Sequence, residues 1–311
     1  MHRRDRGFAL ILVIWSLVIM LGLSAGFAMA VRHETRVAQD LIDTARLDAT
    51  AIAVRNLALL ALNRQDAEQR WRPDGQTRTI QYNGMRAAVR VRSESGRIDL
   101  NRAPRPVIVG LIEQLAPDRD AQALADAVID WRDRDDRRSE YGAEKDDYRN
   151  AGREYTPPNL PFRSVHELGQ VLGFDAELAR RMAPYVSVHS RRPRINAMSA
   201  DAVVLAALPD VDLPTAEQFV VARAQAIRDG SPPPVDMLRG GRRFIEMQLD
   251  ARVLLMDIAV LSDDGLADPE PVALAPLYVE QAVMARGTAQ HYTLLSREAR
   301  QPTDAEPWWL P

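Results

Sequence analysis

The sequence predicts an α+β fold in which one long amino-terminal helix packs on an antiparallel sheet, and a large helical domain interrupts that sheet. Three observations predict it. Residues 8–63 keep a helical spacing of apolar side chains without Gly or Pro beyond Val31. Strand-like segments occur at 79–100 and again at 244–295. Between them, from 101 to 241, the apolar period is that of helices.

The first segment is long and apolar enough to cross a membrane. From Phe8 to Val31 there are 24 residues without a charge, and Ser16 and Ser24 are the only polar side chains. At ~1.5 Å per residue, a helix of this length spans a hydrocarbon core of ~30 Å. Arg3, Arg4 and Arg6 precede the run, which favours a single-pass protein whose amino terminus stays in the cytoplasm.

The helical pattern continues past the apolar run. Apolar residues return to one face, and they include Val37, Leu41, Ile42, Ala45, Ala49, Ile52, Leu59 and Leu60. No Gly or Pro interrupts the segment before Pro73. We therefore expect one helix from about Phe8 to about Asn63, apolar all round at first and amphipathic later.

Three interpretations of the amino terminus stay open on these residues. A cleaved secretory signal would use Ala28-Met29-Ala30 as its small-x-small site, although the apolar run exceeds the usual signal core of ~7–15 residues. An uncleaved signal anchor is the second interpretation. The third is a leader of seven residues that ends in Gly7 and is followed by Phe8, which resembles the leader of type IV pilin-like proteins.

The strands before the helical region begin with a hairpin. Thr79–Tyr82 and Ala87–Arg92 flank Asn83-Gly84, and Asn-Gly between alternating segments is a strong hairpin signal. Arg97–Leu100 is expected to form a third short strand. After the helical region we expect strands at Phe244–Leu249, Arg252–Leu261, Leu277–Ala285 and Tyr292–Leu295, with a turn at Arg286-Gly287-Thr288.

The region between the two sets of strands predicts six helices, at 104–115, 120–131, 164–172, 176–185, 200–208 and 214–228. Ser164 and Ser199 are the expected N-caps of two of them, and Glu167 stands at capping-box spacing from Ser164. We expect this region to fold as a domain of its own.

Composition excludes several classes of function. There is no Cys, so disulfides and thiolate metal sites are excluded. The five His residues have no metal-ligand spacing, and no Gly-x-Ser-x-Gly or phosphate-binding loop is present. The formal charge of −3 gives no reason to expect a nucleic acid as partner. We expect a protein that is not an enzyme.

Four further stretches are similar to one family. They are RIDLN at 97–101, VIDWRD at 128–133, GAE at 142–144 with Tyr148, and PFRSVHEL at 161–168. Behind a prepilin-type leader, this order resembles the minor pseudopilin K of bacterial type II secretion systems. The resemblance implies a pilin-like fold. Its parts would be leader 1–7, transmembrane helix 8–31, further helix and first strands 32–100, inserted helical domain 101–241, sheet strands 242–300 and a loose tail 301–311.

The same resemblance implies a function and a set of partners. The chain would lie at the tip of the type II secretion pseudopilus, where it initiates or caps the filament and supports protein export. It would be anchored in the inner membrane with its globular part in the periplasm. Its partners would be the I-type and J-type minor pseudopilins, the major pseudopilin and the prepilin peptidase. The alternative is a secreted periplasmic binding protein with a cleaved signal peptide.

The resemblance also assigns residues near the amino terminus. Cleavage would fall between Gly7 and Phe8, and Phe8 would then be methylated on its amino group. Most pilin-like subunits have Glu at the fifth mature position, where it pairs with the amino terminus of a neighbour. Counted from Phe8, that position is Leu12. A buried carboxylate without its partner is costly, so its absence fits a subunit that lacks the neighbour.

Two segments of the helical region resemble helix-hairpin-helix, or SAM-like, units. They are 165–185 and 195–223. In DNA-binding proteins the hairpin is Gly-rich and holds a phosphate at a helix start. Here Asp210 and Asp212 occupy the second hairpin and would repel a phosphate. We expect packing modules for partner subunits and no nucleic-acid binding.

Eight carboxylates occur between Asp130 and Asp147. The spacing is not that of an EF-hand, and a solvated, salt-bridged loop is one interpretation. The other is a calcium site, since calcium binds six to eight hard oxygens from irregular segments. Relatives of pseudopilin K are associated with calcium here, and this resemblance favours a site. The candidate ligands are Asp133, Asp135, Asp136, Glu140, Glu144, Asp146 and Asp147.

Overall fold

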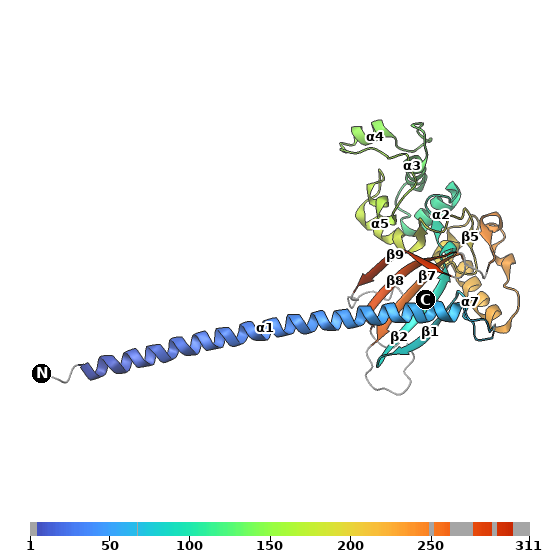
Figure 1. The fold of residues 1–311 in the computed structure, drawn as a ribbon. Helices are drawn as coiled ribbons and strands as arrows, with labels where there is room; N and C mark the ends of the chain where they lie inside the picture. The colour runs from blue at the N-terminus through green and yellow to red at the C-terminus, as the bar shows by residue number, and fades with distance from the viewer. Residues whose placement is uncertain (1–4, 67, 249–251, 262–275, 288–290, 301–311) are drawn as a thin grey trace.

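The computed structural model describes residues 5–66, 68–248, 252–261, 276–287 and 291–300, with side chains from Leu12 onward. It contains one long helix, a five-stranded antiparallel sheet and a helical insert (Figure 1). The expected tail 301–311, Leu249 and Thr288 lie outside the described residues.

Helix α1 (Asp5–Leu62) runs without a break for 58 residues, or about 87 Å at 1.5 Å per residue. Its last quarter packs on the sheet through buried side chains spaced three or four residues apart, which are Leu47, Ala51, Val54, Ala58 and Leu62. This spacing places them on one face of the helix. The predicted helix from about Phe8 to about Asn63 is confirmed.

The sheet consists of five antiparallel strands in the order β1-β2-β7-β8-β9. They are β1 (Asp74–Tyr82), β2 (Met85–Ser93), β7 (Val253–Leu261), β8 (Pro276–Arg286) and β9 (Tyr292–Arg300). Asn83 and Gly84 turn the first hairpin with φ values of 50° and 71°, as a two-residue Asn-Gly turn requires. The hairpin and the three later strands are confirmed, and β9 extends five residues further than predicted.

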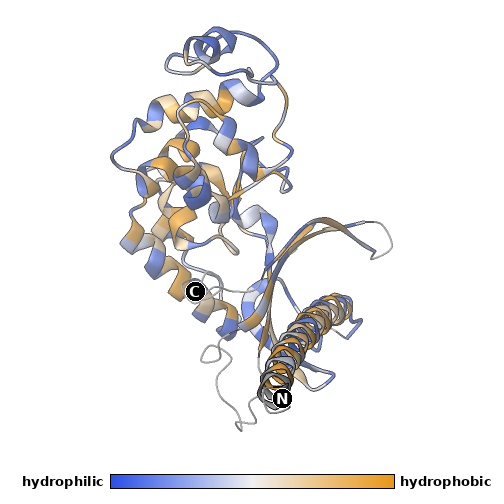
Figure 2. Ribbon diagram, turned by 90° about the vertical axis from the view of Figure 1, so that its left-hand side faces the viewer, coloured by the Kyte–Doolittle hydropathy of each residue, from blue (hydrophilic) through white to orange (hydrophobic). Residues whose placement is uncertain are grey.

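Alternation along the strands gives the sheet two faces of different chemistry. The face under α1 is apolar, and its buried members include Val89, Val91, Met256, Ile258 and Ala282. The intervening positions lie on the other face, where Ala88, Ala259, Leu261 and Val279 form a small apolar cluster. Polar side chains of that face include Arg90, Arg92, Asp257 and Gln281. The insert lies beside that second face, so the sheet separates it from α1 (Figure 2).

The insert begins where β2 ends and returns to the sheet at β7. Its helices are α2 (Arg105–Leu115), α3 (Ala121–Arg132), α4 (Lys145–Asn150), α5 (Ala176–Met182), α6 (Ala202–Ala206) and α7 (Leu213–Asp229). Short 3-10 turns lie between and around them: η1 (Glu94–Gly96), η2 (Val165–Gln170), η3 (Ala183–Tyr185), η4 (Val235–Leu238) and η5 (Arg242–Phe244). The insert has its own apolar core, separate from the one under α1.

Two predicted strands do not join the five-stranded sheet. The third strand shrinks to β3 (Ile98–Asp99), which pairs in parallel with β4 (Val186–Ser187) inside the insert. The segment predicted at 244–249 forms β6 (Ile245–Glu246), which pairs in parallel with β5 (Ile195–Asn196). Their partners lie about 90 and 50 residues away in sequence, so the local apolar pattern could not identify them.

Two local expectations about helices in the insert were also wrong. The segment predicted at 164–172 contains the 3-10 turn η2 (Val165–Gln170) and no α-helix, and just beyond it the Leu172 N–H donates to the Tyr148 hydroxyl at 2.8 Å. Ser199 caps no helix: it accepts a hydrogen bond from the Ser93 N–H at 3.2 Å, and α6 begins after Asp201. The capping box of Ser164 and Glu167 is confirmed.

The two hairpins singled out in the sequence share one local geometry. In each, a residue of positive φ is followed two residues later by an Asp that caps the next helix. Gly173 (φ 91°) precedes Asp175, which accepts from the Leu178 N–H at 2.8 Å. Asp210 (φ 59°) precedes Asp212, which accepts from the Thr215 N–H at 2.8 Å. A carboxylate thus occupies each helix start.

Candidate functional site

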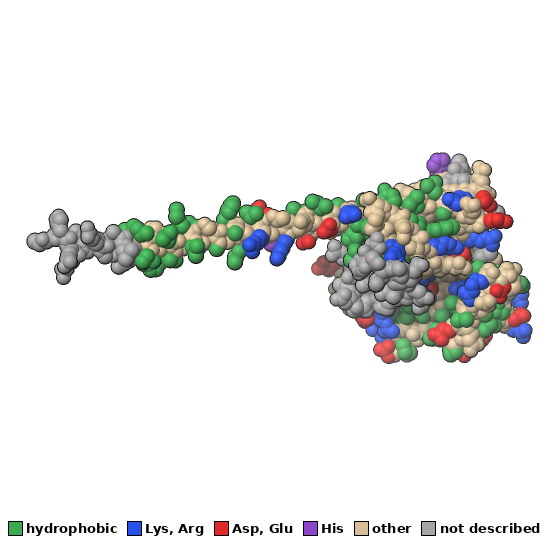
Figure 3. Space-filling model, turned by 90° about the horizontal axis from the view of Figure 1, so that it is seen from below, with side chains coloured by type: hydrophobic (Ala, Val, Ile, Leu, Met, Phe, Trp, Pro, Cys, Tyr) green, Lys and Arg blue, Asp and Glu red, His purple; other side chains and the backbone are tan. Residues whose placement is uncertain are grey.

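The amino-terminal part of α1 projects from the rest of the molecule (Figure 1). Residues 12–46 are all exposed, and Leu12, Trp15 and Phe27 expose 56%, 64% and 73% of their surface. Hydrophobic side chains follow the projecting helix (Figure 3). By length and composition this helix can cross a membrane, with a mean hydropathy of 2.2 in its most apolar window.

The predicted processing site lies at the start of this helix. The backbones of Gly7 and Phe8 belong to the first turns of α1, and their side chains are outside the described ones. Leu12 stands among exposed apolar neighbours on the projecting helix. Cleavage after Gly7 and the role of Leu12 therefore stay predictions.

Beyond the apolar run, α1 still exposes apolar side chains before it reaches the sheet. Val37, Leu41 and Ile42 are 45%, 67% and 66% exposed, and Leu57 and Leu60 are exposed on the outer side of the packed part. Exposed apolar surface in a row of this kind is typical of a contact with other chains. Apolar side chains are thus exposed on α1 both within the membrane-length segment and beyond it.

A buried ionic cluster anchors α1 to the sheet. Arg55 donates to Glu280 of β8, which is fully buried, and Arg297 of β9 donates to the same carboxylate at 2.8 Å. Asp48 accepts from Arg297 and, at 2.6 Å, from the Tyr278 hydroxyl. These bonds lower the pKa of Asp48, with Tyr278 the larger cause and Arg297 the next. Each acid has at least two donors, so the helix is held in one register on the strands.

The acidic run lies at the end of the insert that carries α4, between α3 and η2 (Figure 1). Asp130 is fully buried and accepts hydrogen bonds from the Ser139 hydroxyl at 2.6 Å and from the Ser139 N–H at 3.2 Å. Gly142 packs so closely on it that a Cβ there would lie 1.9 Å from Asp130 Oδ2. The turn at 139–142 is therefore closed around one buried carboxylate.

Four buried acceptor oxygens beside this turn have no hydrogen-bond donor in the part of the chain that the structure describes. They are both carboxylate oxygens of Glu144, Asp133 Oδ1 and Asn159 Oδ1. Burial, followed by the charges of Asp130 and Asp133, raises the pKa of Glu144 to about 7. Burial also raises the pKa of Asp133, and Asp135 and Asp130 add to the effect. Unpaired buried acceptors of this kind are costly unless a proton or a cation meets them.

The other candidate ligands have different surroundings. Asp135 Oδ1 accepts from the Arg137 N–H at 2.9 Å, and Asp136 Oδ1 accepts from the Asn159 amide at 2.8 Å. Asp147 accepts from the Glu144 N–H and pairs with Arg138 at 3.1 Å. Asp146 pairs with Arg149 at the surface, and Glu140 is exposed. Asp130 and Asn159 were not among the candidates, and nothing in their spacing indicates them.

The donor set suits a hard cation, although the side chains are not gathered into a finished site. Carboxylate and amide oxygens are the ligands that calcium prefers. Among the described residues, no three acidic or His side chains come close enough together to hold a metal ion as they stand. The buried oxygens of Glu144, Asp133 and Asn159 nevertheless fit a cation, because one would replace the donors they lack.

An aromatic cluster packs next to the acidic run. Trp131 stacks on Phe162 with ring centroids 6.0 Å apart and lies 6.2 Å from Tyr148. Tyr148 belongs to α4 and is fully buried, so it fixes that short helix to the core of the insert. The acidic loop thus stands on a rigid base.

Comparisons with known proteins agree on one family. Residues 99–191 match the family model described as "Type II secretion system (T2SS), protein K". Three similar curated proteins carry the name type II secretion system protein K. That of Klebsiella pneumoniae is 27% identical over 72% of this chain and 77% of its own length. Those of Pectobacterium carotovorum subsp. carotovorum and Aeromonas hydrophila are each 30% identical, over 60% and 54% of this chain and 63% and 54% of theirs.

A solved structure has the same fold. A chain of the GspK-GspI-GspJ complex from the type 2 secretion system of enterotoxigenic Escherichia coli matches with a TM-score of 0.54. The match covers 87% of this chain and 99% of that chain at 19% identity. The two chains therefore share a fold over the part that is covered.

Proposed function

We propose that this chain, which belongs to the type II secretion system protein K family, is a minor pseudopilin that lies at the tip of the pseudopilus. There it would initiate or cap the filament and support protein export across the outer membrane. Its helix would hold it in the inner membrane, with the sheet and the insert in the periplasm.

The division of α1 is the observation that carries this proposal. Residues 12–46 are exposed and largely apolar, whereas the segment from Leu47 to Leu62 is packed on the sheet. The exposed apolar side chains of such a helix would be covered by the membrane before assembly and by neighbouring helices in a filament. A periplasmic binding protein with a cleaved signal would have no use for the exposed row at Val37, Leu41 and Ile42.

Two features support a place at the tip. Leu12 cannot supply the carboxylate that pairs with the amino terminus of a neighbour. The insert adds a second domain of its own core to the sheet, and a subunit of that bulk fits an end of a tightly wound filament better than its length. Other minor pseudopilins, of the I and J types, would bind it through the apolar faces of their long helices and through the lower faces of their globular parts. The hairpins of the insert would act as SAM-like packing modules.

Immunogold labelling of the full-length chain tests the position. Label at one end of each filament is the expected result, and overproduction of the chain should shorten filaments because each added cap ends one. Label along the length of filaments would contradict the proposal. Mass spectrometry of the mature chain separates the alternatives: Phe8 as first residue supports a pseudopilin, Val31 a secreted protein and an intact leader a signal anchor.

We also propose that calcium binds the acidic run. The support is the set of buried acceptors without donors, on Glu144, Asp133 and Asn159, together with the raised pKa of both acids. Asp135 and Asp136 follow Asp133 closely in sequence, and Asp136 accepts from the Asn159 amide, so their carboxylates would complete the set of oxygens. Calcium would supply positive charge that lets these acids ionise and would thereby order the loop. Calcium-dependent melting of the chain is the test, and its design follows in the Discussion.

A further inference from the structure

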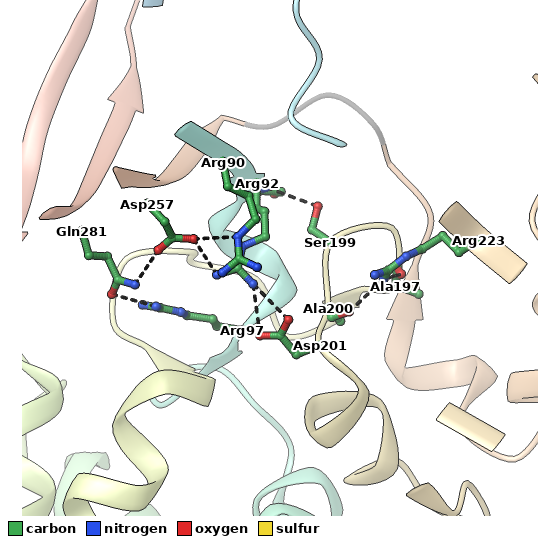
Figure 4. A network of polar contacts seen from close by, with 11 residues as sticks. Arg90, Arg92, Arg97, Ala197, Ser199, Ala200, Asp201, Arg223, Asp257 and Gln281 are labelled. Carbon is green, nitrogen blue, oxygen red and sulfur yellow. Dashed lines mark hydrogen bonds and ion pairs between the residues drawn. The ribbon is translucent and has the colours of Figure 1, made fainter. Parts of the chain in front are cut away.

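The sheet and the insert meet through a cluster of charged side chains on the face of the sheet that lies away from α1 (Figure 4). Arg92 of β2 donates to Asp257 of the neighbouring strand β7 at 2.9 Å. The same guanidinium group donates to both carboxylate oxygens of Asp201, at 3.0 and 3.1 Å. Asp201 is the residue before α6, so Arg92 connects the two domains.

The sheet holds its half of this cluster in place. Asp257 accepts from Arg90 at 3.2 Å and from the Gln281 amide at 2.8 Å, in addition to Arg92. Burial raises the pKa of Asp257, but Arg92 and Arg90 outweigh burial and lower it to about 2. Gln281 in turn accepts from Arg97 at 2.8 Å. Arg92 has little freedom on this side, since only 11% of its side chain is exposed.

On the side of the insert, hydrogen bonds fix the loop that leads to Asp201. Arg223 of α7 donates to the carbonyl oxygens of Ala197 and Ala200, at 2.6 and 2.8 Å, and so clamps the loop that leads to Asp201. In the same loop Ser199 accepts from the Ser93 N–H at the end of β2. Gly96 packs on this loop so closely that a Cβ would lie 2.6 Å from the Ser199 carbonyl oxygen. Contacts from α7 and from the connector between sheet and insert, residues 94–97, therefore fix this loop.

A count of charges shows why the insert must supply an acid. On the sheet and its connector lie three guanidinium groups, those of Arg90, Arg92 and Arg97. Two carboxylates, Asp257 and Glu94, face them from the same side. One guanidinium group of the sheet is left without a carboxylate of its own, and Asp201 of the insert pairs with it through Arg92. The Arg92 side chain is 11% exposed and that of Asp201 47%, and Arg223 of α7 lies near the same carboxylate. An unbalanced buried charge is costly, so the pairing favours one placement of the insert.

We propose that Asp201 is a positioning residue, which holds the insert in a single orientation on the sheet through Arg92. The role of this contact in capping rests on the proposed function, because a cap would obstruct the filament only if the insert is held firmly on the sheet. The orientation itself is a separate property, and it can be measured whether or not the chain is a cap.

The absence of Cys makes the orientation measurable by distance between two labels. Thr79→Cys on β1 and Glu217→Cys on α7 are exposed sites on the two domains, and they would carry the only thiols of the full-length chain in detergent micelles. Double electron-electron resonance then reports the distance distribution between sheet and insert. We expect a single narrow distribution for the doubly labelled chain with Asp201 intact.

Three further variants test the role of Asp201. Asp201→Ala should broaden the distribution, because it removes the balancing acid; Asp201 makes no capping hydrogen bond that would be lost with it. Asp201→Glu should restore a narrow distribution. Gly96→Ala should broaden it by a different route, since the new methyl group collides with the Ser199 carbonyl. Asp236→Ala is the matched control, because Asp236 is exposed in the same insert and pairs only at the surface.

The outcomes are distinct. A distribution as narrow in Asp201→Ala as in the parent chain would overturn the positioning role, and so would equal broadening by Asp236→Ala. The meaning for the filament is tested by overproducing unlabelled chains: Asp201→Ala should shorten filaments less than the natural chain does. If it broadens the distribution but shortens filaments equally, the role in capping is overturned. If the natural chain shortens no filaments, the cap itself fails, and the distance measurement still decides the role of Asp201.

Discussion

Arg55 of the long helix donates to Glu280 of the sheet in the interior between them, where Glu280 has no exposed surface. Only 11% of the Arg55 side chain is exposed. Arg55→Met should therefore lower the free energy of unfolding by about 3 kcal/mol, because it leaves a buried carboxylate with Arg297 as its remaining cation. Urea unfolding of the full-length chain in detergent measures the loss.

The double variant Arg55→Met, Glu280→Met should recover most of that stability, since the buried charge is removed with its partner. Arg239→Met is the matched control: its pair with Asp236 is exposed on both sides, so a change within about 0.5 kcal/mol is expected. An equal loss in the control, or no recovery in the double variant, would count against a buried ion pair as the anchor of α1.

Glu144 predicts a dependence of stability on pH in the absence of metal. Its pKa is about 7 in the folded chain, above its ordinary value of 4.5. The folded state therefore keeps the proton longer, and the chain loses stability as the pH rises from about 4.5 through about 7, by up to about 3 kcal/mol. In chelator, Glu144→Gln should remove this slope and raise the melting temperature at pH about 8.

Calcium should make the natural chain more thermally stable than Glu144→Gln, which is the reverse of the order expected in chelator. The natural chain should gain about 2.7 kcal/mol at a hundredfold excess over the dissociation constant, and Glu144→Gln should gain little. Glu154→Gln, at an exposed position of the same loop, should behave as the natural chain does. Melting curves that ignore calcium in all three chains would leave the acidic run a solvated loop.

Gly142 is expected to accept no side chain. The Cβ of Gly142→Ala would lie 1.9 Å from Asp130 Oδ2 and 2.7 Å from its Cγ, and Asp130 is fully buried. We expect a loss of about 1–3 kcal/mol, together with a weaker response to calcium, because the turn around Asp130 must open. Gly169→Ala is the control: its Cβ would meet only Ala179 Cβ at 4.0 Å, an ordinary contact. Equal thermal stability of the two variants would contradict the tight turn.

Gly7→Ala should block removal of the leader, because the peptidase site depends on the small residue before Phe8. Mass spectrometry of the chain from membranes should find the intact leader in the variant and Phe8 as first residue in the natural chain. Gly22→Ala changes a Gly further along α1 that has open space around it, and its processing should be normal. Normal processing of Gly7→Ala would place the cleavage site elsewhere.

Local patterns in the sequence predicted much of this fold. The spacing of apolar residues located α1, five helices of the insert and the strands of the sheet, and Asn83-Gly84 located the hairpin. These patterns involve residues only a few positions apart, so they can be recognised in a single sequence. The resemblance to pseudopilin K came from short motifs at 97–101, 128–133 and 161–168, and the comparisons agree with it.

The sequence by itself determined a membrane-length helix, a hairpin, a helical insert and an acidic run of unknown ligands. Only the tertiary structure decided that β3 and β6 pair inside the insert, and that in the acidic run both carboxylate oxygens of Glu144 and one of Asp133 lack a donor among the described residues. It alone brought Arg92 to Asp201, 109 positions later, and to Asp257, 165 positions later. The physical reason is that pairing and burial depend on which distant segments meet, and neither apolar period nor turn chemistry carries that information.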